Sequence, residues 1–148
     1  MIISITLDQQ VGGIAQSLIN YSKALKKINK THLVILPDKA VIIKDLEDIS
    51  NVKLVKIPKI LLKFHLITKF VFDKNLENLL SSSKFIFIHN YKLVKYLSNF
   101  RNKIGLINHS GKARKPHNNI YNIFLTSAAK ERFLTKYPLS RTKNIIIP

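Results

Sequence analysis

Cysteine is absent from this sequence, and acidic residues are scarce, with eight Asp and Glu among 148 residues. The lack of cysteine excludes disulfides and thiolate metal sites, and it gives no sign of an oxidising compartment. The histidines show neither the H-x-x-x-H nor the H-E-x-x-H spacing of helical zinc sites, so we expect no metal site. A G-x-S-x-G elbow and a Gly-Lys-Ser/Thr phosphate loop are missing too, which argues against a serine hydrolase and a P-loop enzyme.

Long apolar runs and targeting features are also missing. No stretch approaches the ~20 apolar residues of a membrane-spanning helix. Residues 1–6 (MIISIT) lack the basic region and the small-residue cleavage site of a signal peptide, and they are typical of a first strand. From these absences we expect a cytoplasmic soluble protein.

Basic residues are abundant, and the 25 Lys and Arg give a formal net charge of +17. Such an excess attracts nucleic acid or an anionic membrane surface. Biased coding is the other explanation, because Ile, Lys and Asn all have AT-rich codons and together make up 56 of the 148 residues. Arginine, the residue best suited to forked recognition of phosphates and bases, occurs only four times.

Short apolar runs alternate with helical stripes along the chain. Strands are predicted at residues 2–7, 32–36, 52–57, 84–88, 104–107, 120–125 and 144–147, and helices at 14–28, 58–80, 91–100 and 127–136. Residues 38–50 are predicted as a loop or short helix, and 111–119 as a basic loop. This alternation is typical of parallel βαβ units with right-handed crossovers. We therefore predict one α/β domain over residues 1–148, with a doubly wound, mainly parallel sheet of about seven strands.

Polar and small residues follow three successive predicted strands. They are His89 and Asn90 after the strand at 84–88, Asn108, His109, Ser110 and Gly111 after 104–107, and Thr126 and Ser127 after 120–125. Because ligands bind at the carboxyl edge of an open α/β sheet, these residues are candidates for a site. His109 can donate or accept a hydrogen bond near neutral pH, and His89 with Asn90 is its weaker counterpart; a structural, hydrogen-bonded histidine is the alternative.

Each of three further features can be interpreted either as functional or as structural. Gly12 and Gly13 allow a tight turn and a close approach to a ligand, and the amides opening the next helix suit a diphosphate; an ordinary strand-to-helix turn is the alternative. Lys112 and Arg114 lie in a basic loop that could hold a phosphate or simply be solvated. Ser127 opens a helix, which favours helix capping over ligand contact.

Four segments, in order, resemble the N-terminal half of a GT-B glycosyltransferase, most closely the family 4 retaining enzymes. They are VGGIAQSLINYSKALKK, FIFIHN, GLINHSG and FLTSAAKERFLTKYPLSRTKNIIIP. The resemblance covers nearly the whole chain and implies a Rossmann-like domain. It also implies that Gly12 and Gly13 approach the donor phosphates and that His109 lines the reaction centre. Complete members transfer a sugar from a nucleotide-sugar to a lipid or saccharide acceptor, often in cell-envelope synthesis such as that of lipopolysaccharide.

The chain departs from the family at two places. Ala15 and Gln16 stand where the family often has an acidic or basic pair. The sequence ends at Pro148, before the Asn-Gly that opens the family's second domain, which holds the nucleotide-sugar site and its paired glutamates. We therefore expect residues 1–148 to form the acceptor-side domain, with the C-terminal nucleotide-sugar domain absent or on a separate chain. We expect no cofactor, and no sugar transfer by this domain alone.

Residues 57–72 (IPKILLKFHLITKFVF) combine lysines with bulky apolar residues. On one continuous helix, Lys59, Lys63 and Lys74 would fall within about 60° of one another. Such a helix could lie on the anionic inner face of a membrane and bring the domain to a lipid-linked acceptor; a core helix with one solvated stripe is the alternative. A basic module for nucleic acid is the rival function, although Tyr and Phe fall mostly at apolar positions rather than on a stacking platform.

Overall fold

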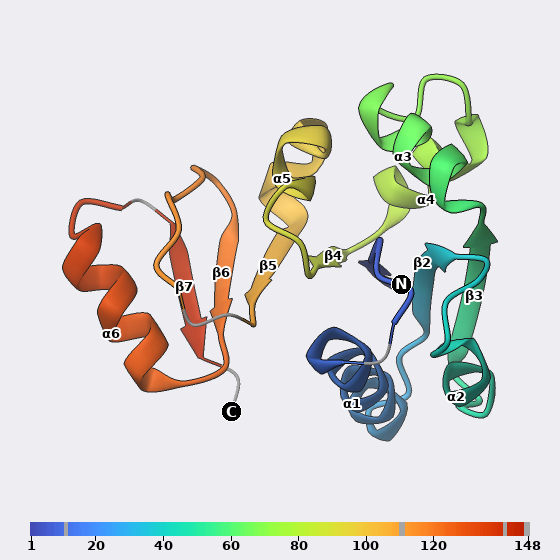
Figure 1. Cartoon of the computed structure of the whole chain (residues 1–148), viewed down its shortest axis with the longest axis horizontal. Helices are drawn as coiled ribbons and strands as arrows, with labels where there is room; N and C mark the ends of the chain where they lie inside the picture. The colour runs from blue at the N-terminus through green and yellow to red at the C-terminus, as the bar shows by residue number, and fades with distance from the viewer. Residues whose placement is uncertain (11, 110–111, 141, 147–148) are drawn as a thin grey trace.

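The protein, described here by a computed structural model, is an α/β domain built on one parallel sheet (Figure 1). The structure describes residues 1–10, 12–109, 112–140 and 142–146. Within them, seven strands pair in the order β3-β2-β1-β4-β5-β6-β7, and every pairing is parallel. The strands are β1 (Ile2–Ile5), β2 (His32–Pro37), β3 (Val52–Ile57), β4 (Phe85–Ile88), β5 (Ile104–Asn108), β6 (Tyr121–Phe124) and β7 (Lys143–Ile146). The predicted doubly wound fold is confirmed.

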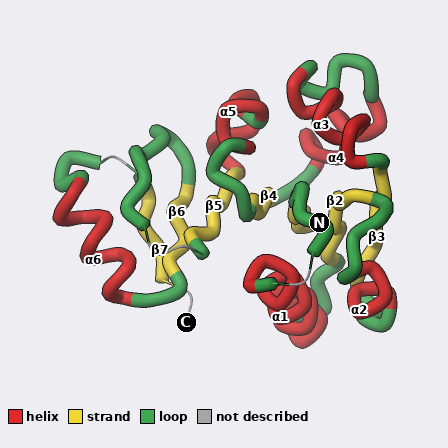
Figure 2. Tube along the Cα trace, in the orientation of Figure 1, coloured by secondary structure: helices red, strands yellow, loops and turns green. Residues whose placement is uncertain are grey.

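The helices form a layer on each side of the sheet (Figures 1 and 2). They are α1 (Gly13–Lys27), α2 (Ile43–Glu47), α3 (Lys59–Ile67), α4 (Lys74–Ser82), α5 (Leu93–Tyr96), the 3-10 helix η1 (Ser98–Lys103) and α6 (Ser127–Lys136). α1 and α2 cover one face, whereas α3, α4 and α5 pack on the other. In the described part of the chain, no helix combines the length and the apolar character needed to cross a membrane.

Successive side chains of a strand point to opposite faces of the sheet, so each packs against the helices that cover its own face. Ile3 and Ile5 of β1 pair with Leu33 and Ile35 of β2, and all four belong to the core beneath α3 and α4. The intervening Val34 faces α1 and α2 instead. Because both faces of the central strands are buried, these strands are mainly apolar, as is typical of a parallel sheet.

One buried polar cluster ties β1, β2 and α1 together. His32 is fully buried, with Nε2 2.7 Å from Ser4 Oγ and Nδ1 2.7 Å from Ser22 Oγ. Ser22 Oγ donates its hydrogen to the carbonyl of Leu18 at 2.7 Å, so it accepts from His32 Nδ1, and His32 Nε2 accepts from Ser4. Burial lowers the pKa of His32 to about 4. His32 is therefore a neutral, structural histidine.

The segment predicted as one helix over residues 58–80 is instead two helices, α3 and α4, separated by residues 68–73. After α3, the amide of Phe70 donates to the carbonyl of His65 at 2.8 Å, and that of Lys69 to Leu66 at 3.2 Å. This is a Schellman ending, with Lys69 in the left-handed region at φ 52°. Asp73 then caps α4 by accepting from the amide of Leu76 at 3.0 Å. Lys59 and Lys63 consequently lie on a different helix from Lys74, so the predicted single lysine stripe is wrong.

Smaller corrections concern the ends of elements. The first strand ends at Ile5 rather than at residue 7, and the helix predicted over 91–100 is the short α5 followed by η1. The strand at 52–57 and the helix at 127–136 have the predicted bounds.

The strand order contains a switch point between β1 and β4. The chain leaves β1 through α1 on one face and leaves β4 through α5 on the other. In an open α/β sheet, the crevice outside the carboxyl ends of the strands at such a point is where ligands bind. The candidate residues of the β4 and β5 ends lie at this edge.

Candidate functional site

A cavity of about 350 Å³ lies at the carboxyl edge of β4, β5 and β6. The loop from His89 to Lys92 forms one wall, and Ile14 at the start of α1 contributes to it. Phe124 of β6 and Phe133 of α6 add an apolar part, with ring centres 5.3 Å apart. Its size and its mixture of apolar and polar groups suit a small organic ligand.

Two histidines from neighbouring strand ends meet in this cavity. His89 Nδ1 lies 2.9 Å from His109 Nε2, and the rings are stacked, with centres 5.1 Å apart and planes 25° apart. The contact follows from the sheet, because β4 and β5 are adjacent and each histidine comes directly after its strand. The two residues are 20 positions apart in the sequence.

Burial holds both histidines in the neutral form. It lowers the pKa of His89, which is only 6% exposed, to about 3, with smaller contributions from His109 and His32. Burial also lowers the pKa of His109, and the opposing effect of the Asp8 carboxylate is smaller. At neutral pH one hydrogen therefore lies between the two rings.

The shared hydrogen couples the tautomers of the two rings. If His89 Nδ1 donates, then His109 carries its hydrogen on Nδ1 and can donate to a ligand; if His109 Nε2 donates, its Nδ1 is an acceptor. His89 Nε2 is buried, and no hydrogen-bond partner for it exists among the described residues. A neutral pair of this kind can therefore either donate a hydrogen bond to a ligand hydroxyl group or accept one from it.

Cations surround the opening of the cavity. Lys92, Arg114 and Lys115 line it and are exposed, and no described lining residue is acidic. Tyr91 connects the loop after β4 to the loop that contains Arg114 and Lys115. Its hydroxyl donates to the carbonyl of Lys115 at 2.8 Å, and its ring lies 5.4 Å from the Arg114 guanidinium carbon. This arrangement favours an anionic ligand, with hydroxyl groups at the histidine pair.

The structure brings together five of the predicted site residues: His89, Asn90, Asn108, His109 and Arg114. The Asn90 side chain accepts from the amide of Lys92 at 3.0 Å, which orders the loop after β4. Ser110 and Gly111 lie outside the described residues.

The predicted glycines lie next to the cavity. Gly12 caps α1, Gly13 begins it, and the following residue, Ile14, lines the cavity. Gly12 has extended backbone at φ 172°, and a Cβ on either glycine would meet no atom within 4 Å. Packing therefore does not require glycine at either position.

Three predicted residues, Lys112, Thr126 and Ser127, lie elsewhere. Lys112 lines a separate, shallow depression with Arg114, Arg132 and Lys136. Ser127 is exposed on the first turn of α6 and does not line the cavity. Its predicted capping role is wrong, because Thr126 caps the helix by accepting from the amide of Ala129 at 3.2 Å.

Several residues of the site were not predicted. Tyr91 and Lys92 directly follow His89 and Asn90, so the same strand-end signal would have found them. Asp8 follows β1 and acts on His109 across the end of β4, which lies between β1 and β5; only the strand order reveals this proximity.

Within the described ranges, no three or more His, Asp and Glu side chains are grouped so that they could hold a metal ion. No family model, curated protein or solved structure matches the chain.

Proposed function

We propose that this chain is the acceptor-binding domain of a sugar-transferring enzyme of the GT-B type. The observation that carries the proposal is the neutral His89–His109 pair in a cation-rimmed cavity at the carboxyl edge of the sheet. The resemblance of the four ordered segments to family 4 glycosyltransferases supplies the reaction class. The acceptor would be a sugar or a lipid-linked sugar that carries a phosphate.

Each part of the cavity would have its own task. The hydroxyl that receives the sugar would hydrogen-bond to His109, whose tautomer His89 sets. Arg114 and Lys115 would hold the phosphate of the acceptor. The donor nucleotide-sugar would be bound chiefly by a second domain, with its diphosphate facing the amides after Gly12.

Binding of simple sugars and phosphates tests the proposal. The protein, with ¹⁵N-labelled histidine, would be titrated with a hexose, a hexose phosphate and inorganic phosphate while the imidazole signals are followed by NMR. We expect the hexose phosphate to bind most tightly and to shift the signals of His89 and His109. Unchanged histidine signals with all three probes would contradict the proposal.

A matched pair of arginine variants locates the phosphate. Arg114→Gln should weaken binding of the hexose phosphate about ten- to hundredfold, because a charge-assisted hydrogen bond contributes about 1.5–3 kcal/mol. Arg132→Gln is the control, since Arg132 does not line the cavity, and it should change little. Equal losses in both variants would indicate a general effect of charge.

The rival function is a basic module for nucleic acid. Binding of DNA that falls steeply with salt, together with no response of His109 to the hexose phosphate, would replace the present proposal. We also expect no sugar transfer when the purified chain is incubated with nucleotide-sugars and acceptors. Transfer by this chain alone would contradict the assignment of the donor site to a second domain.

A further inference from the structure

Helix α3 and the turn after it expose an unusual amount of apolar surface. We call this surface the α3–α4 corner; its exposed apolar residues are Ile60, Leu61, Phe64, Ile67, Val71 and Phe72. Ile60 is 84% exposed and Phe72 72% exposed. Because scattered single apolar residues are ordinary on a surface but contiguous groups mark contact sites, the corner is a candidate docking surface.

The exposed residues are not needed for the core. α3 already packs on the sheet through Leu62 and Leu66, and the turn packs through the fully buried Phe70. The helix is thus apolar on its outer face as well as on its inner face. An exposed apolar face of this kind lowers the solubility of a protein, which indicates that a partner covers it.

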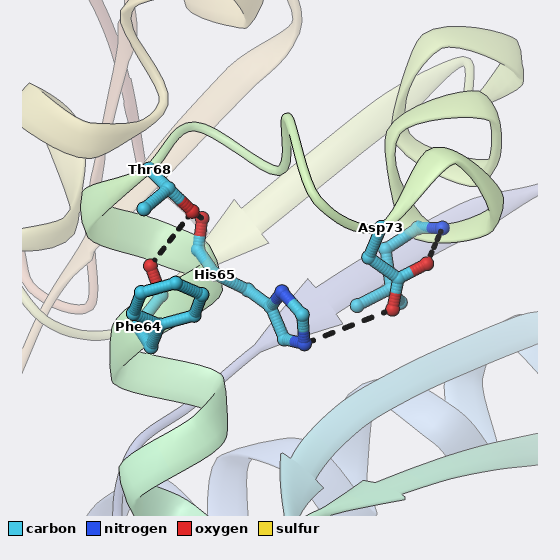
Figure 3. A network of polar contacts seen from close by, with 5 residues as sticks. Phe64, His65, Thr68 and Asp73 are labelled. Carbon is cyan, nitrogen blue, oxygen red and sulfur yellow. Dashed lines mark hydrogen bonds and ion pairs between the residues drawn. The ribbon is translucent and has the colours of Figure 1, made fainter.

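A network of contacts holds the turn in shape (Figure 3). Figure 3 shows the His65 ring directed toward Asp73, with His65 Nε2 3.8 Å from Asp73 Oδ2. Thr68 Oγ1 donates to the carbonyl of Phe64 at 2.9 Å. Phe64 and Phe72 stack, with ring centres 5.7 Å apart. The two exposed aromatic rings are therefore presented together at a fixed place.

Lysines border the same surface. Lys63 and Lys69 are exposed, and neither has an acidic partner among the described ion pairs. Lys74 pairs with Glu77 at 2.8 Å, and Asp73 is engaged by the amide of Leu76. The corner therefore presents apolar side chains beside cationic groups, with little exposed negative charge.

We propose that the α3–α4 corner docks on the surface of an anionic lipid bilayer. Its apolar side chains enter the boundary between headgroups and acyl chains, and Lys63 and Lys69 remain among the lipid headgroups. Charge selects this partner over a second copy of the chain, because two corners would bring lysines against lysines in a protein of net charge +17. The inference rests on this surface alone and does not depend on the proposed function.

Vesicle flotation tests the docking directly. The full chain is mixed with vesicles of phosphatidylcholine alone or of an equimolar mixture with phosphatidylglycerol. We expect flotation with the anionic vesicles and little with the neutral ones. Equal flotation with both compositions, or none with either, would overturn the proposal.

Matched variants separate insertion from simple charge attraction. Phe72→Ser and Ile60→Ser should each weaken partitioning about tenfold or more, because transfer of such a side chain out of water is lost. Leu139→Ser is the control, since Leu139 is 93% exposed but lies outside the corner, and it should leave partitioning unchanged. Circular dichroism checks that each variant is folded. Equal effects of all three substitutions would show that the corner is not the contact.

The lysines and the competing partner are tested separately. The double variant Lys63→Gln, Lys69→Gln should bind the anionic vesicles about 30-fold more weakly, since two lysines near such a surface together contribute about 2 kcal/mol. Sedimentation analysis without lipid measures self-association. A dimer that Phe72→Ser abolishes, without vesicle binding by the native chain, would assign the corner to a second copy and overturn the membrane proposal.

Discussion

Gly105 on β5 is a residue where the packing leaves no room for a side chain. A Cβ at this position would lie 2.5 Å from Phe85 Cε1 and 2.8 Å from Ile123 Cδ1. The absence of a side chain lets the Phe85 ring lie over β5, where it also contacts the rings of Phe87 and Tyr121 at 5.0 and 5.4 Å between centres.

Gly105→Ala should therefore lower the free energy of unfolding by about 1–3 kcal/mol, because the Phe85 ring must move. Urea denaturation measures the change. Gly13→Ala is the control, since a Cβ there meets no atom within 4 Å, and it should cause no loss. If both substitutions destabilise equally, the close contact at Gly105 is not the cause.

Asp8 is the residue that adjusts the histidine pair. Its carboxylate raises the pKa of His109 against the larger, lowering effect of burial. Asp8→Asn should therefore lower the pKa of His109 further, as followed by NMR titration of the imidazole. Asp38→Asn is a suitable control, because Asp38 follows β2 and does not act on His109. An unchanged or higher His109 pKa in Asp8→Asn would contradict the assigned electrostatic effect.

At the scale of elements, the ending of α3 decides the shape of the α3–α4 corner. Lys69 and Phe70 both have left-handed backbone, at φ 52° and 65°, which side chains with a Cβ adopt only at a cost. This backbone places Phe70 in the core and Asp73 at the N-cap of α4, and these contacts offset the strain.

Lys69→Gly should raise the free energy of unfolding by about 0.5–1 kcal/mol, because glycine relieves this strain but adds chain entropy to the unfolded state. Lys69→Ala removes the same charge without relieving the backbone, so it should bring no gain. Chemical denaturation of the two variants distinguishes the effects. A gain of the same size in both would point to charge rather than backbone strain.

At the scale of the whole molecule, two buried neutral histidines make stability depend on pH. His32 and His89 have pKa values lowered to about 4 and about 3, whereas in the unfolded chain they titrate near 6.5. Below pH 6.5 the unfolded state therefore binds more protons than the folded state. By linkage, stability must fall as the pH is lowered from 6.5 toward 4.

We expect His32 alone to remove about 3 kcal/mol over this range. Urea denaturation at a series of pH values measures the slope, and His89→Asn should flatten it by removing one titrating group. High salt separates this effect from general repulsion, because salt screens exposed charges but not the desolvation of a buried ring. A flat profile, or one that salt abolishes, would contradict the assignment to buried histidines.

Local sequence patterns are enough to predict the type of many individual elements. Residues 52–57 and 127–136 have the predicted strand and helix, because their apolar periodicity and bounding residues agree with their final environment. The placement of His89 and His109 at strand ends was also predictable, since it needs only the position of each strand in the chain. A doubly wound parallel sheet follows from the alternation of such elements.

Which distant residues come into contact depends on the tertiary structure. The break at residues 68–73 carries no glycine or proline, and it depends on the burial of Phe70, which no local pattern reveals. The pairing of His89 with His109, and their neutral state, follow from the adjacency of β4 and β5 and from burial at the sheet edge. Contacts between distant residues and the pKa values that they set depend on strand order and desolvation, which are properties of the folded chain as a whole.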